Sequence, residues 1–322
     1  LFLPLMDVKA QNELRSQHEA NFMARYKNRW RVRACISSQR RCLSGAFRFI
    51  PLATPSIDSL GLPPLLKEIA TRPRGLFLVT GPANSGKTHT LAAIVNEINR
   101  MSARHVITIE DPIEYVHEHK NCVVTQREVG LDTEGWEIAL KNTLRQAPDV
   151  ILMGEIRDRE TMEYAVQFAE TGHLCLATLH ANSTNQALDR IINFFPETKR
   201  EQVFMDLSLN LRGMVSQRLI PLREGKGRIA AIEIMLNSPL IADLIFKGNV
   251  PEIKEVMKRS GELGMQTFDQ SLFKLFDEGF ISYEDALRNA DSVNDLRLQI
   301  KLNSKEGKER DLTAGVKDLD LL

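Results

Sequence analysis

The sequence predicts an α/β fold with a mainly parallel sheet that is covered by helices on both faces. Between residue 65 and about residue 240, short apolar runs alternate with segments of helical periodicity, the pattern typical of such a sheet. The second observation is the octapeptide GPANSGKT at residues 81–88, which lies between an apolar run and a helical pattern. Strand, glycine-rich loop and helix together are the context of a phosphate-binding loop, so we expect a nucleoside triphosphate to bind here.

Each part of this loop has an expected chemical task. Gly81 and Gly86 let the backbone turn tightly enough for successive N–H groups to face phosphate oxygens, beside the positive end of the next helix. Lys87 is expected to reach the β- and γ-phosphates, and the Thr88 hydroxyl is expected to bind Mg²⁺. The full set of expected nucleotide contacts is Gly81, Pro82, Ala83, Asn84, Ser85, Gly86, Lys87, Thr88 and Thr90.

Composition narrows the class of protein. Of the 322 residues, 42 are Lys or Arg and 42 are Asp or Glu, so net charge gives no indication of nucleic acid or an anionic membrane as a partner. Apolar runs are too short to cross a bilayer. The four cysteines have spacings that fit neither a zinc pair nor a disulfide framework, which favours a reducing cytosol; they are Cys35, Cys42, Cys122 and Cys175. The first four residues include neither an initiating Met nor a signal-peptide head, so we expect an N-terminally incomplete fragment.

Residues 1–50 are the least regular part of the chain. Residues 8–22 are expected to form a polar helix, and residues 30–36 and 47–50 are expected to form strands. Arginines are dense here and either form a solvated basic face or reach a phosphate; they are Arg25, Arg29, Arg31, Arg33, Arg40, Arg41 and Arg48. Residues 51–64 contain four prolines, and we interpret them as a linker to the next domain.

Five strands are expected in the core. They are residues 76–80, 105–110, 150–154, 174–179 and 228–235. Because parallel sheets bind ligands at the carboxyl ends of their strands, the residues that follow these runs are informative. The first run leads into the glycine-rich loop, and polar residues follow the next three. The expected site is therefore assembled from four strand ends.

Carboxylates at these strand ends have separable roles. Glu155 ends an apolar run in the way of a Walker B strand, which delivers an acid beside Mg²⁺ and the γ-phosphate. Glu110, Asp111 and Glu114 follow the second strand, and any one of them could orient the attacking water. Spacing alone does not choose among these three. His180 and His173, near the fourth strand, are each compatible with a structural or a catalytic role.

Three segments carry a resemblance to a known family. They are ITIEDPIEYVHEHK, LRQAPDVILMGEIRDRETME and AETGHLCLATLHANSTNQALDRIINFFP, which resemble the Asp box, Walker B region and His box of secretion-type hexameric ATPases. More narrowly, residues 57–302 resemble the type IV pilus twitching-motility or retraction branch, the PilT/PilU family, and lean toward PilU. The resemblance implies a RecA-like ATPase core at residues 65–240, a partial PAS-like domain at 1–50, and a helical region at 241–302.

The same resemblance implies roles and partners. Glu114 would act on the attacking water, Glu155 would lie near Mg²⁺, and His173 and His180 would sense the γ-phosphate. Arg31, Arg48 and one of Arg40 or Arg41 would reach nucleotide at a subunit boundary. The implied cofactors are ATP and Mg²⁺. The implied partners are a homo-hexamer, a paralogous retraction ATPase and an inner-membrane pilus platform protein, without nucleic acid, at the cytoplasmic base of a pilus machine.

The region after the core departs from the family pattern in one segment. Where the retraction branch carries an AIRNLI-like stretch, residues 240–245 read LIADLI, which makes independent retraction by this chain less secure. Further on, residues 267–270 form a capping box, and residues 282–289 and 292–300 are expected to be helices. Residues 303–322 mix charges with small residues and are expected to be disordered.

Three alternative functions remain open from the sequence. An extension or secretion ATPase has the same fold but generally carries a tetracysteine zinc insert, which this sequence lacks. A nucleic-acid motor of RecA-like type would show ATPase stimulation by DNA that depends on salt. An accessory nucleotide-binding subunit would depend on a paralogue for hydrolysis.

Overall fold

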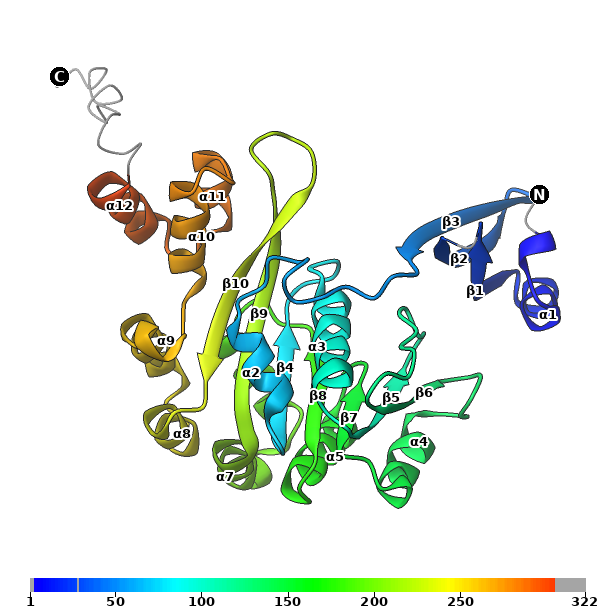
Figure 1. Cartoon of the computed structure of the whole chain (residues 1–322), viewed down its shortest axis with the longest axis horizontal. Coiled ribbons are helices and arrows are strands. Elements are labelled where there is room, and N and C mark those ends of the chain that lie inside the picture. The colour runs from blue at the N-terminus through cyan, green and yellow to red at the C-terminus, as the bar shows by residue number, and fades with distance from the viewer. Residues whose placement is uncertain (1–2, 28, 305–322) are drawn as a thin grey trace.

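The computed structural model describes residues 3–27 and 29–304. An N-terminal sheet, a central α/β core and a group of C-terminal helices follow one another along the long axis of the molecule (Figure 1). The predicted α/β class with a mainly parallel sheet is confirmed.

The N-terminal unit is a three-stranded antiparallel sheet with one helix against it. After the 3-10 turn η1 (Leu3–Leu5), its elements are α1 (Val8–Gln17), β1 (Glu19–Tyr26), β2 (Trp30–Gln39) and β3 (Cys42–Pro51). The prediction of a helix over residues 8–22 is wrong beyond Gln17. His18 adopts a left-handed conformation with φ 63°, which ends the helix, and residues 19–22 belong to β1. Both predicted strands lie inside β2 and β3, and the helix packs Leu14 against Ile36 of the sheet.

The core sheet has the strand order β10-β9-β4-β8-β7-β5-β6. All pairs are parallel except β9 with β10. The five predicted strands are confirmed within one residue as β4 (Gly75–Thr80), β5 (His105–Glu110), β7 (Val150–Met153), β8 (Leu174–Leu179) and β10 (Arg228–Leu236). The sequence reading missed β6 (Val123–Glu128) and β9 (Leu211–Pro221).

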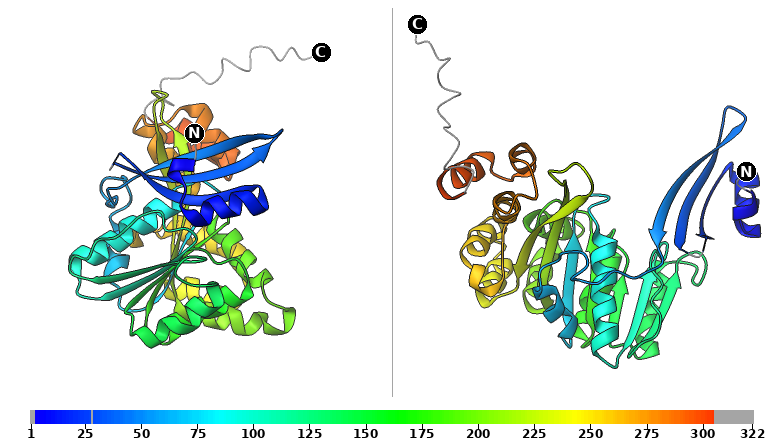
Figure 2. Two further views of the ribbon diagram at one scale, coloured as in Figure 1. Left: turned by 90° about the vertical axis from the view of Figure 1, so that its right-hand side faces the viewer. Right: turned by 45° about the horizontal axis from the view of Figure 1, so that its top comes forward.

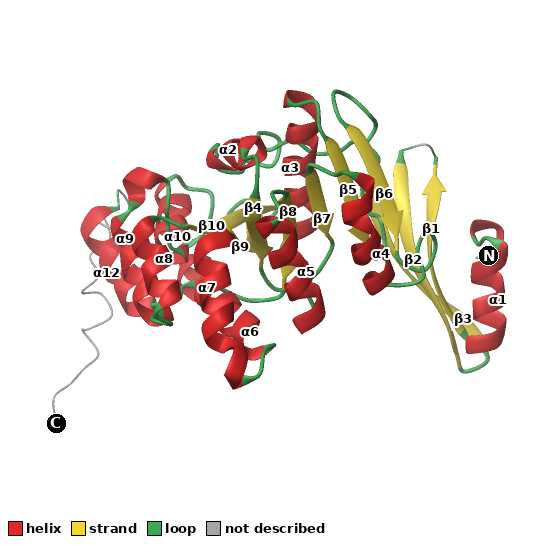
Figure 3. Ribbon diagram, turned by 90° about the horizontal axis from the view of Figure 1, so that it is seen from below, coloured by secondary structure: helices red, strands yellow, loops and turns green. Residues whose placement is uncertain are grey.

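Helices cover both faces of this sheet (Figure 3). On one face, α2 (Leu65–Thr71) and α3 (Lys87–Met101) pack against alternate strand residues such as Phe77 and Val79. The intervening residues Leu76 and Leu78 face the opposite side. The helices on that side are α4 (Trp136–Thr143), α5 (Arg159–Glu170), α6 (Thr184–Asn193) and α7 (Arg200–Asn210). Strands buried on both faces explain why these runs are almost wholly apolar.

The segment between the two sheets packs onto the core. Ile57 and Leu62 are buried in the same cluster as residues of α2 and α3, so at least this part of the proline-containing stretch is anchored. The extended connection is visible in both views of Figure 2.

The chain ends in a group of short helices. They are α8 (Pro239–Phe246), α9 (Val250–Arg259), α10 (Phe268–Asp277), α11 (Tyr283–Asn289) and α12 (Val293–Asn303). The predicted capping box is confirmed, because the Thr267 and Gln270 side chains each accept a hydrogen bond from the other residue's backbone N–H. Residues 305–322, most of the expected disordered tail, lie outside the described residues. Among residues 3–27 and 29–304, no helix is long and apolar enough to span a bilayer.

Candidate functional site

The glycine-rich loop has the backbone shape that a phosphate site needs. It joins the end of β4 to the start of α3, with φ values of 149° at Gly81 and 93° at Gly86, in a region that favours glycine. A Cβ at Gly81 would lie 2.5 Å from the Gln217 carbonyl oxygen and 2.4 Å from Ser85 Oγ. No residue other than glycine fits this turn. The Ser85 hydroxyl oxygen is buried without a hydrogen-bond partner in the described part of the chain, so the loop retains unused polar capacity.

A glutamine on the missed strand β9 supports the loop from beneath. The Gln217 amide nitrogen donates to the Ser85 carbonyl oxygen at 2.6 Å, and its amide oxygen accepts from Thr90 Oγ1 at 2.8 Å. Gln217 is 2% exposed. Thr90 is 1% exposed and its hydroxyl donates to Gln217, so the expected contact between Thr90 and nucleotide stays a prediction. Periodicity gave no signal for Gln217, since it lies between Ser216 and Arg218 on a strand of mixed polarity.

The side chains of Lys87, His180 and Glu155 contact one another in a row across three strand ends. Lys87 Nζ donates to the carbonyl oxygens of Gly81 and Pro82, each at 2.8 Å, and lies 3.4 Å from His180 Nδ1. His180 Nε2 lies 3.3 Å from Glu155 Oε1. Because a lysine ammonium can only donate, Nδ1 accepts and the imidazole proton sits on Nε2, facing the carboxylate.

Burial lowers the pKa values of Lys87 and His180. Desolvation lowers the pKa of Lys87 to about 8, against the opposing attraction of Glu155. Desolvation, followed by the Lys87 charge, also lowers the pKa of His180, so the imidazole is neutral at neutral pH. A desolvated ammonium beside an open cavity is stabilised by any anion that enters. The arrangement is suited to phosphate.

A cavity of about 400 Å³ lies above these residues at the carboxyl edge of the sheet. Side chains of Lys87, Thr88, Glu114, Glu155 and His180 line it together. These residues come from the ends of β4, β5, β7 and β8, which are the four strand ends named from the sequence. The loop residues Ala83 and Asn84 also line the cavity.

The three carboxylates after β5 have different surroundings. Burial raises the pKa of Glu110 to about 7, and its Oε1 accepts from Thr108 Oγ1 at 2.7 Å. Asp111 is exposed, with Oδ2 at 3.7 Å from Arg157 Nη2. The Glu114 side chain is 12% exposed and faces the cavity near two arginines. Glu110 Oε1 also accepts from the Gln126 amide nitrogen at 3.2 Å, so this carboxyl group is already held by two side chains.

Arginines of the N-terminal sheet approach this chain's own site. Arg48 donates to the side chain of Asn84 in the glycine-rich loop, and its Nη1 lies 3.7 Å from Glu114 Oε1. Arg33 Nη1 lies 3.8 Å from the same oxygen. Arg33 and Arg48 are paired residues on β2 and β3, so they point to one face. In the sequence Arg33 is only one member of the basic cluster, and its pairing with Arg48 becomes evident from the hairpin register.

Other predicted arginines are placed differently. Arg31 Nη2 donates to the Ile113 carbonyl oxygen at 2.8 Å, so it supports the backbone beside Glu114. Arg40 and Arg41 occupy the turn between β2 and β3, at the opposite end of the hairpin from Arg31. Arg48 lies at the site of its own chain, and the expected contact of these arginines with nucleotide at a subunit boundary stays a prediction.

His173 is separated from the cavity. It precedes β8, whereas His180 follows it, so the two histidines lie at opposite edges of the sheet. The His173 Nδ1 atom contacts Thr171 Oγ1 at 3.0 Å and the Phe168 carbonyl oxygen at 3.1 Å. Within this chain His173 lies away from the cavity, and the expectation that it senses the γ-phosphate stays a prediction. Strand direction was the signal that could have separated the two histidines.

A second cavity, of about 800 Å³, opens on the other side of the glycine-rich loop. Its walls include the apolar side chains of Leu60, Leu62, Leu219 and Ile229. The loop therefore lies between a polar cavity lined by carboxylates and a more apolar one. No sequence motif indicates this second cavity, because its walls include the proline-containing segment and the β9–β10 hairpin.

The donor set fits a hard divalent cation. The Thr88 hydroxyl and the Glu155 carboxylate line the same cavity, and oxygen ligands of this kind suit Mg²⁺. Glu155 is held by His180 and by Arg157 Nε, which lies 3.0 Å from Oε2. In the described part of the chain, no group of three or more His, Cys, Asp or Glu side chains forms a protein-only metal site. A cation here would rely on nucleotide oxygens as further ligands, as Mg²⁺ commonly does.

Comparison with known proteins defines the class. A family model described as type II/IV secretion system protein matches residues 52–239, which is more than half of the chain. The chain belongs to this family, whose resemblance was expected from the three sequence boxes.

Relatives narrow the assignment within that family. The type IV pilus ATPase PilU of Pseudomonas aeruginosa is 55% identical over 303 residues, which cover 94% of this chain and 79% of that protein. The type IV pilus retraction ATPase PilT of the same organism is 41% identical over 290 residues, covering 90% and 84%. A crystal structure of the pilus retraction motor PilT with bound ADP gives a TM-score of 0.84 at 40% identity, covering 91% of this chain and 83% of that one. This chain is an ATPase of the PilT/PilU type.

Proposed function

We propose that this chain is a subunit of an ATP-hydrolysing ring motor that powers or assists retraction of a type IV pilus. The observation that carries the proposal is the convergence of Lys87, Thr88, Glu114, Glu155 and His180 on one cavity, in a chain that is 55% identical to PilU. We infer a homo-hexamer that works in the cytoplasm at the inner-membrane base of the pilus machine. A paralogous retraction ATPase and a membrane platform protein would be its partners.

In this proposal the phosphates bind at the glycine-rich loop. Lys87 exchanges the Gly81 and Pro82 carbonyl oxygens for the β- and γ-phosphate oxygens. The neutral His180 then keeps its Nε2 proton for Glu155 or for a γ-phosphate oxygen, and so senses whether that phosphate is present. Loop amide groups and the α3 dipole add favourable electrostatics at the same place.

Glu114 is the residue we assign to the attacking water. It lines the cavity, and Arg33 and Arg48 lie within salt-bridge distance of its carboxylate. Glu110 is already engaged by hydrogen bonds from Thr108 and Gln126, and Asp111 is exposed and paired with Arg157. When the nucleotide occupies the site, Arg48 and Arg33 would also face negative charge on the γ-phosphate, where charge develops during transfer.

Mg²⁺ is expected at Thr88 and Glu155. When bound, it would neutralise charge on the β- and γ-phosphate oxygens. His180 contacts one oxygen of the Glu155 carboxylate and Arg157 contacts the other, which fixes the orientation of this side chain.

The second cavity is the place we assign to the nucleoside. Apolar walls at Leu60, Leu62, Leu219 and Ile229 suit the faces of a flat base, and the cavity is continuous with loop residues 84–90. The polar cavity would then hold the γ-phosphate and the attacking water. The glycine-rich loop would lie between the two.

The test is pilus retraction in cells that carry Lys87→Ala in this protein. With the paralogous retraction ATPase deleted, we expect motility to fall to the level of cells that lack this protein. Wild-type motility in that background would contradict a motor role. Cells that keep the paralogue are the comparison.

A second candidate function is an accessory subunit that depends on the paralogue. The observation that favours it is the departure at α8, where Ala242 and Asp243 stand in the family segment and Asp243 pairs with Lys247 at 2.7 Å. Unchanged retraction by Lys87→Ala in cells that keep the paralogue, together with loss of retraction when the whole protein is deleted, would favour this candidate.

A further inference from the structure

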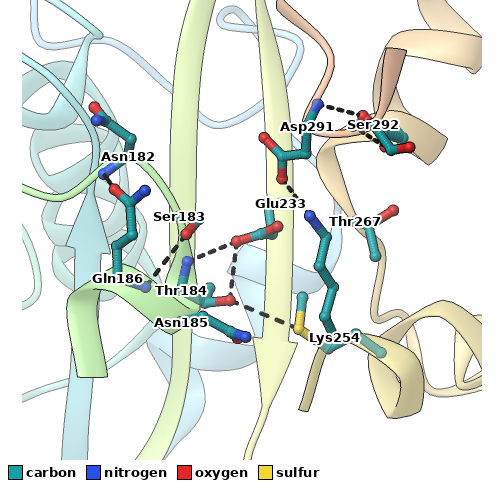
Figure 4. Close-up of polar contacts among 12 residues, drawn as sticks. Asn182, Ser183, Thr184, Asn185, Gln186, Glu233, Lys254, Thr267, Asp291 and Ser292 are labelled. Carbon is teal, nitrogen blue, oxygen red and sulfur yellow. Dashed lines mark hydrogen bonds and ion pairs between the residues drawn. The ribbon is translucent and has the colours of Figure 1, made fainter. Parts of the chain in front are cut away.

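The loop that carries His180 is held by hydrogen bonds from other elements. This loop, residues 180–184, connects β8 to α6. The Asn182 carbonyl oxygen accepts from Arg218 Nη2 at 2.9 Å, and the Thr184 N–H donates to Glu233 Oε1 at 2.6 Å. Glu233 also accepts from Thr184 Oγ1 at 2.9 Å and is 1% exposed (Figure 4). Both holding residues come from the β9–β10 hairpin.

Arg218 makes most of its other contacts with the C-terminal helices. Its Nη1 donates to the Asn289 carbonyl oxygen at 2.6 Å, and its Nη2 lies 2.8 Å from Asp291 Oδ1. The guanidinium carbon lies 4.0 Å from the centre of the Phe268 ring. Lys254 Nζ holds the other Asp291 oxygen at 2.6 Å, as Figure 4 shows. The Arg218 guanidinium thus connects the His180 loop to three places in the C-terminal region. They are Phe268 of α10, Asn289 at the end of α11, and Asp291 shortly before α12.

The position of Arg218 on β9 places it beside the nucleotide site. Thr80 at the end of β4 pairs with Ser216, so Gln217 and Arg218 extend past the start of the glycine-rich loop. Successive strand residues point to opposite faces. Gln217 reaches the loop and α3 on one face, and Arg218 reaches the His180 loop and the C-terminal helices on the other.

We propose that Arg218 is a positioning residue that sets His180 against the γ-phosphate and makes ATP turnover depend on the placement of helices α10–α12. Only Ala181 separates His180 from Asn182, and Ala181 is 9% exposed, so a displaced Asn182 carbonyl moves His180 with it. The guanidinium fork is planar and rigid, so a shift of Asn289 or Asp291 changes its contact with Asn182. The inference rests on the γ-phosphate role proposed for His180.

The test compares Arg218→Gln with Arg212→Gln in the whole chain. Arg212 is a matched control because it lies on the same strand and also donates to backbone carbonyls, those of Arg74 and Leu209, at the other edge of the sheet. For Arg218→Gln we expect kcat to fall about 10-fold, with the Kd for ADP within about twofold of wild type. The Arg212→Gln variant should keep wild-type kcat. A lower melting temperature with unchanged kcat would overturn the proposal.

Two further variants separate positioning from folding. Added to His180→Ala, the Arg218→Gln change should lower kcat no further, because the residue through which it acts is gone. Asp291→Ala should lower kcat in the same way as Arg218→Gln, and the double variant should match Arg218→Gln alone. An equal additional loss in the His180→Ala background would overturn the proposal. If the wild-type chain hydrolyses no ATP, the proposed function fails; if it hydrolyses ATP and Arg218→Gln matches it, only this inference fails.

Discussion

At the scale of single residues, Lys87 and Glu110 are two of the ionisable groups at the site with strongly shifted pKa values, and each of these two shifts has a measurable consequence. Lys87 is held near two carbonyl oxygens with its pKa lowered to about 8, and Glu110 lies beneath Glu114 with its pKa raised to about 7. Both shifts have burial as their largest cause. An anion that binds beside Lys87 stabilises its buried charge, whereas Glu110 loses its buried charge by taking up a proton.

Lys87 makes nucleotide affinity depend on pH. Phosphate oxygens favour the charged ammonium, so the pKa of Lys87 rises when ADP binds. Affinity should be constant up to about pH 8, the free-state pKa, and then weaken toward tenfold per pH unit. Isothermal titration of ADP at pH 7, 8 and 9 measures this. Lys87→Arg is the control, because its guanidinium stays charged and its affinity, though lower, should be flat with pH. A flat wild-type profile would contradict the account.

Glu110 makes stability depend on pH in the opposite direction from most carboxylates. Its pKa is about 7 in the folded chain against 4.5 ordinarily, so between these values the folded state holds a proton that the unfolded state has released. The free energy of unfolding therefore falls as pH rises from 4.5 to 7. Glu110→Gln should be more stable than wild type at pH 8 by up to about 3 kcal/mol, and similar at pH 4. Denaturant unfolding measures the stability at each of these two pH values. The control is Glu252→Gln at an exposed position, which should leave the stability unchanged at both. Equal stability of Glu110→Gln and wild type at pH 8 would refute the shift.

At the scale of elements, strands buried on both faces were predictable and strands with polar functions were not. The runs at β4, β5, β7, β8 and β10 are apolar because helices cover them on both sides. β6 lies at the sheet edge and contains Gln126, Arg127 and Glu128, which hide it from an apolar search. β9 contains Ser216, Gln217 and Arg218 where it passes the glycine-rich loop. Their side chains serve neighbouring loops, which no local pattern reveals.

The site could be predicted as far as strand order and motif allow. Lys87, Thr88, Glu155 and His180 were all named from positions after strand ends, and they do line one cavity. Arg33 was not singled out, because its role depends on how the N-terminal sheet is placed over the core. Our assignment of the water to Glu114 rather than Glu110 or Asp111 rests on the side-chain partners of the three carboxylates, which spacing does not contain.

The support of the loop by β9 gives a prediction at this scale. Gln217→Leu keeps the side-chain volume but leaves the Ser85 carbonyl oxygen and the Thr90 hydroxyl without their partner. Buried groups left unpaired cost about 1–3 kcal/mol each, so the loop should lose its preformed shape. We expect ADP affinity to weaken by about tenfold or more. Titration with ADP measures this, and Gln202→Leu on the exposed side of α7 is the control. Unchanged affinity would show that the loop keeps its shape without Gln217.

At the scale of the whole molecule, the N-terminal sheet lies over the core of its own chain and completes the polar cavity. Arg33 and Arg48 extend from this sheet toward Glu114, whereas the core supplies the glycine-rich loop and the carboxylates. In a ring motor, this contact would let nucleotide binding change the angle between the two units. Arg33 and Arg48 would then couple ATP hydrolysis to the movement of the N-terminal sheet relative to the core.

Mixing two impaired variants tests whether Arg48 acts at the nucleotide site of its own chain. Arg48→Ala should lower kcat by about 10²-fold, as for loss of one donor at a developing charge. Mixed with Lys87→Ala chains, it should recover no activity, because neither chain then holds a complete site. Recovery in mixed rings, measured as phosphate release at several mixing ratios, would mean that the arginine serves the neighbouring subunit.

The central claim is that this chain hydrolyses ATP at the cavity lined by Glu114 and Glu155, and phosphate release by Glu114→Gln tests it most directly. The wild-type chain should release phosphate from MgATP. Glu114→Gln should bind ATP with near wild-type affinity while turnover falls by about 10²–10⁴-fold, since the group that orients the water is lost. Glu155→Gln should also weaken the Mg²⁺-dependent part of nucleotide affinity. Near-normal turnover by Glu114→Gln would contradict the account and assign the water to Asp111 or Glu110.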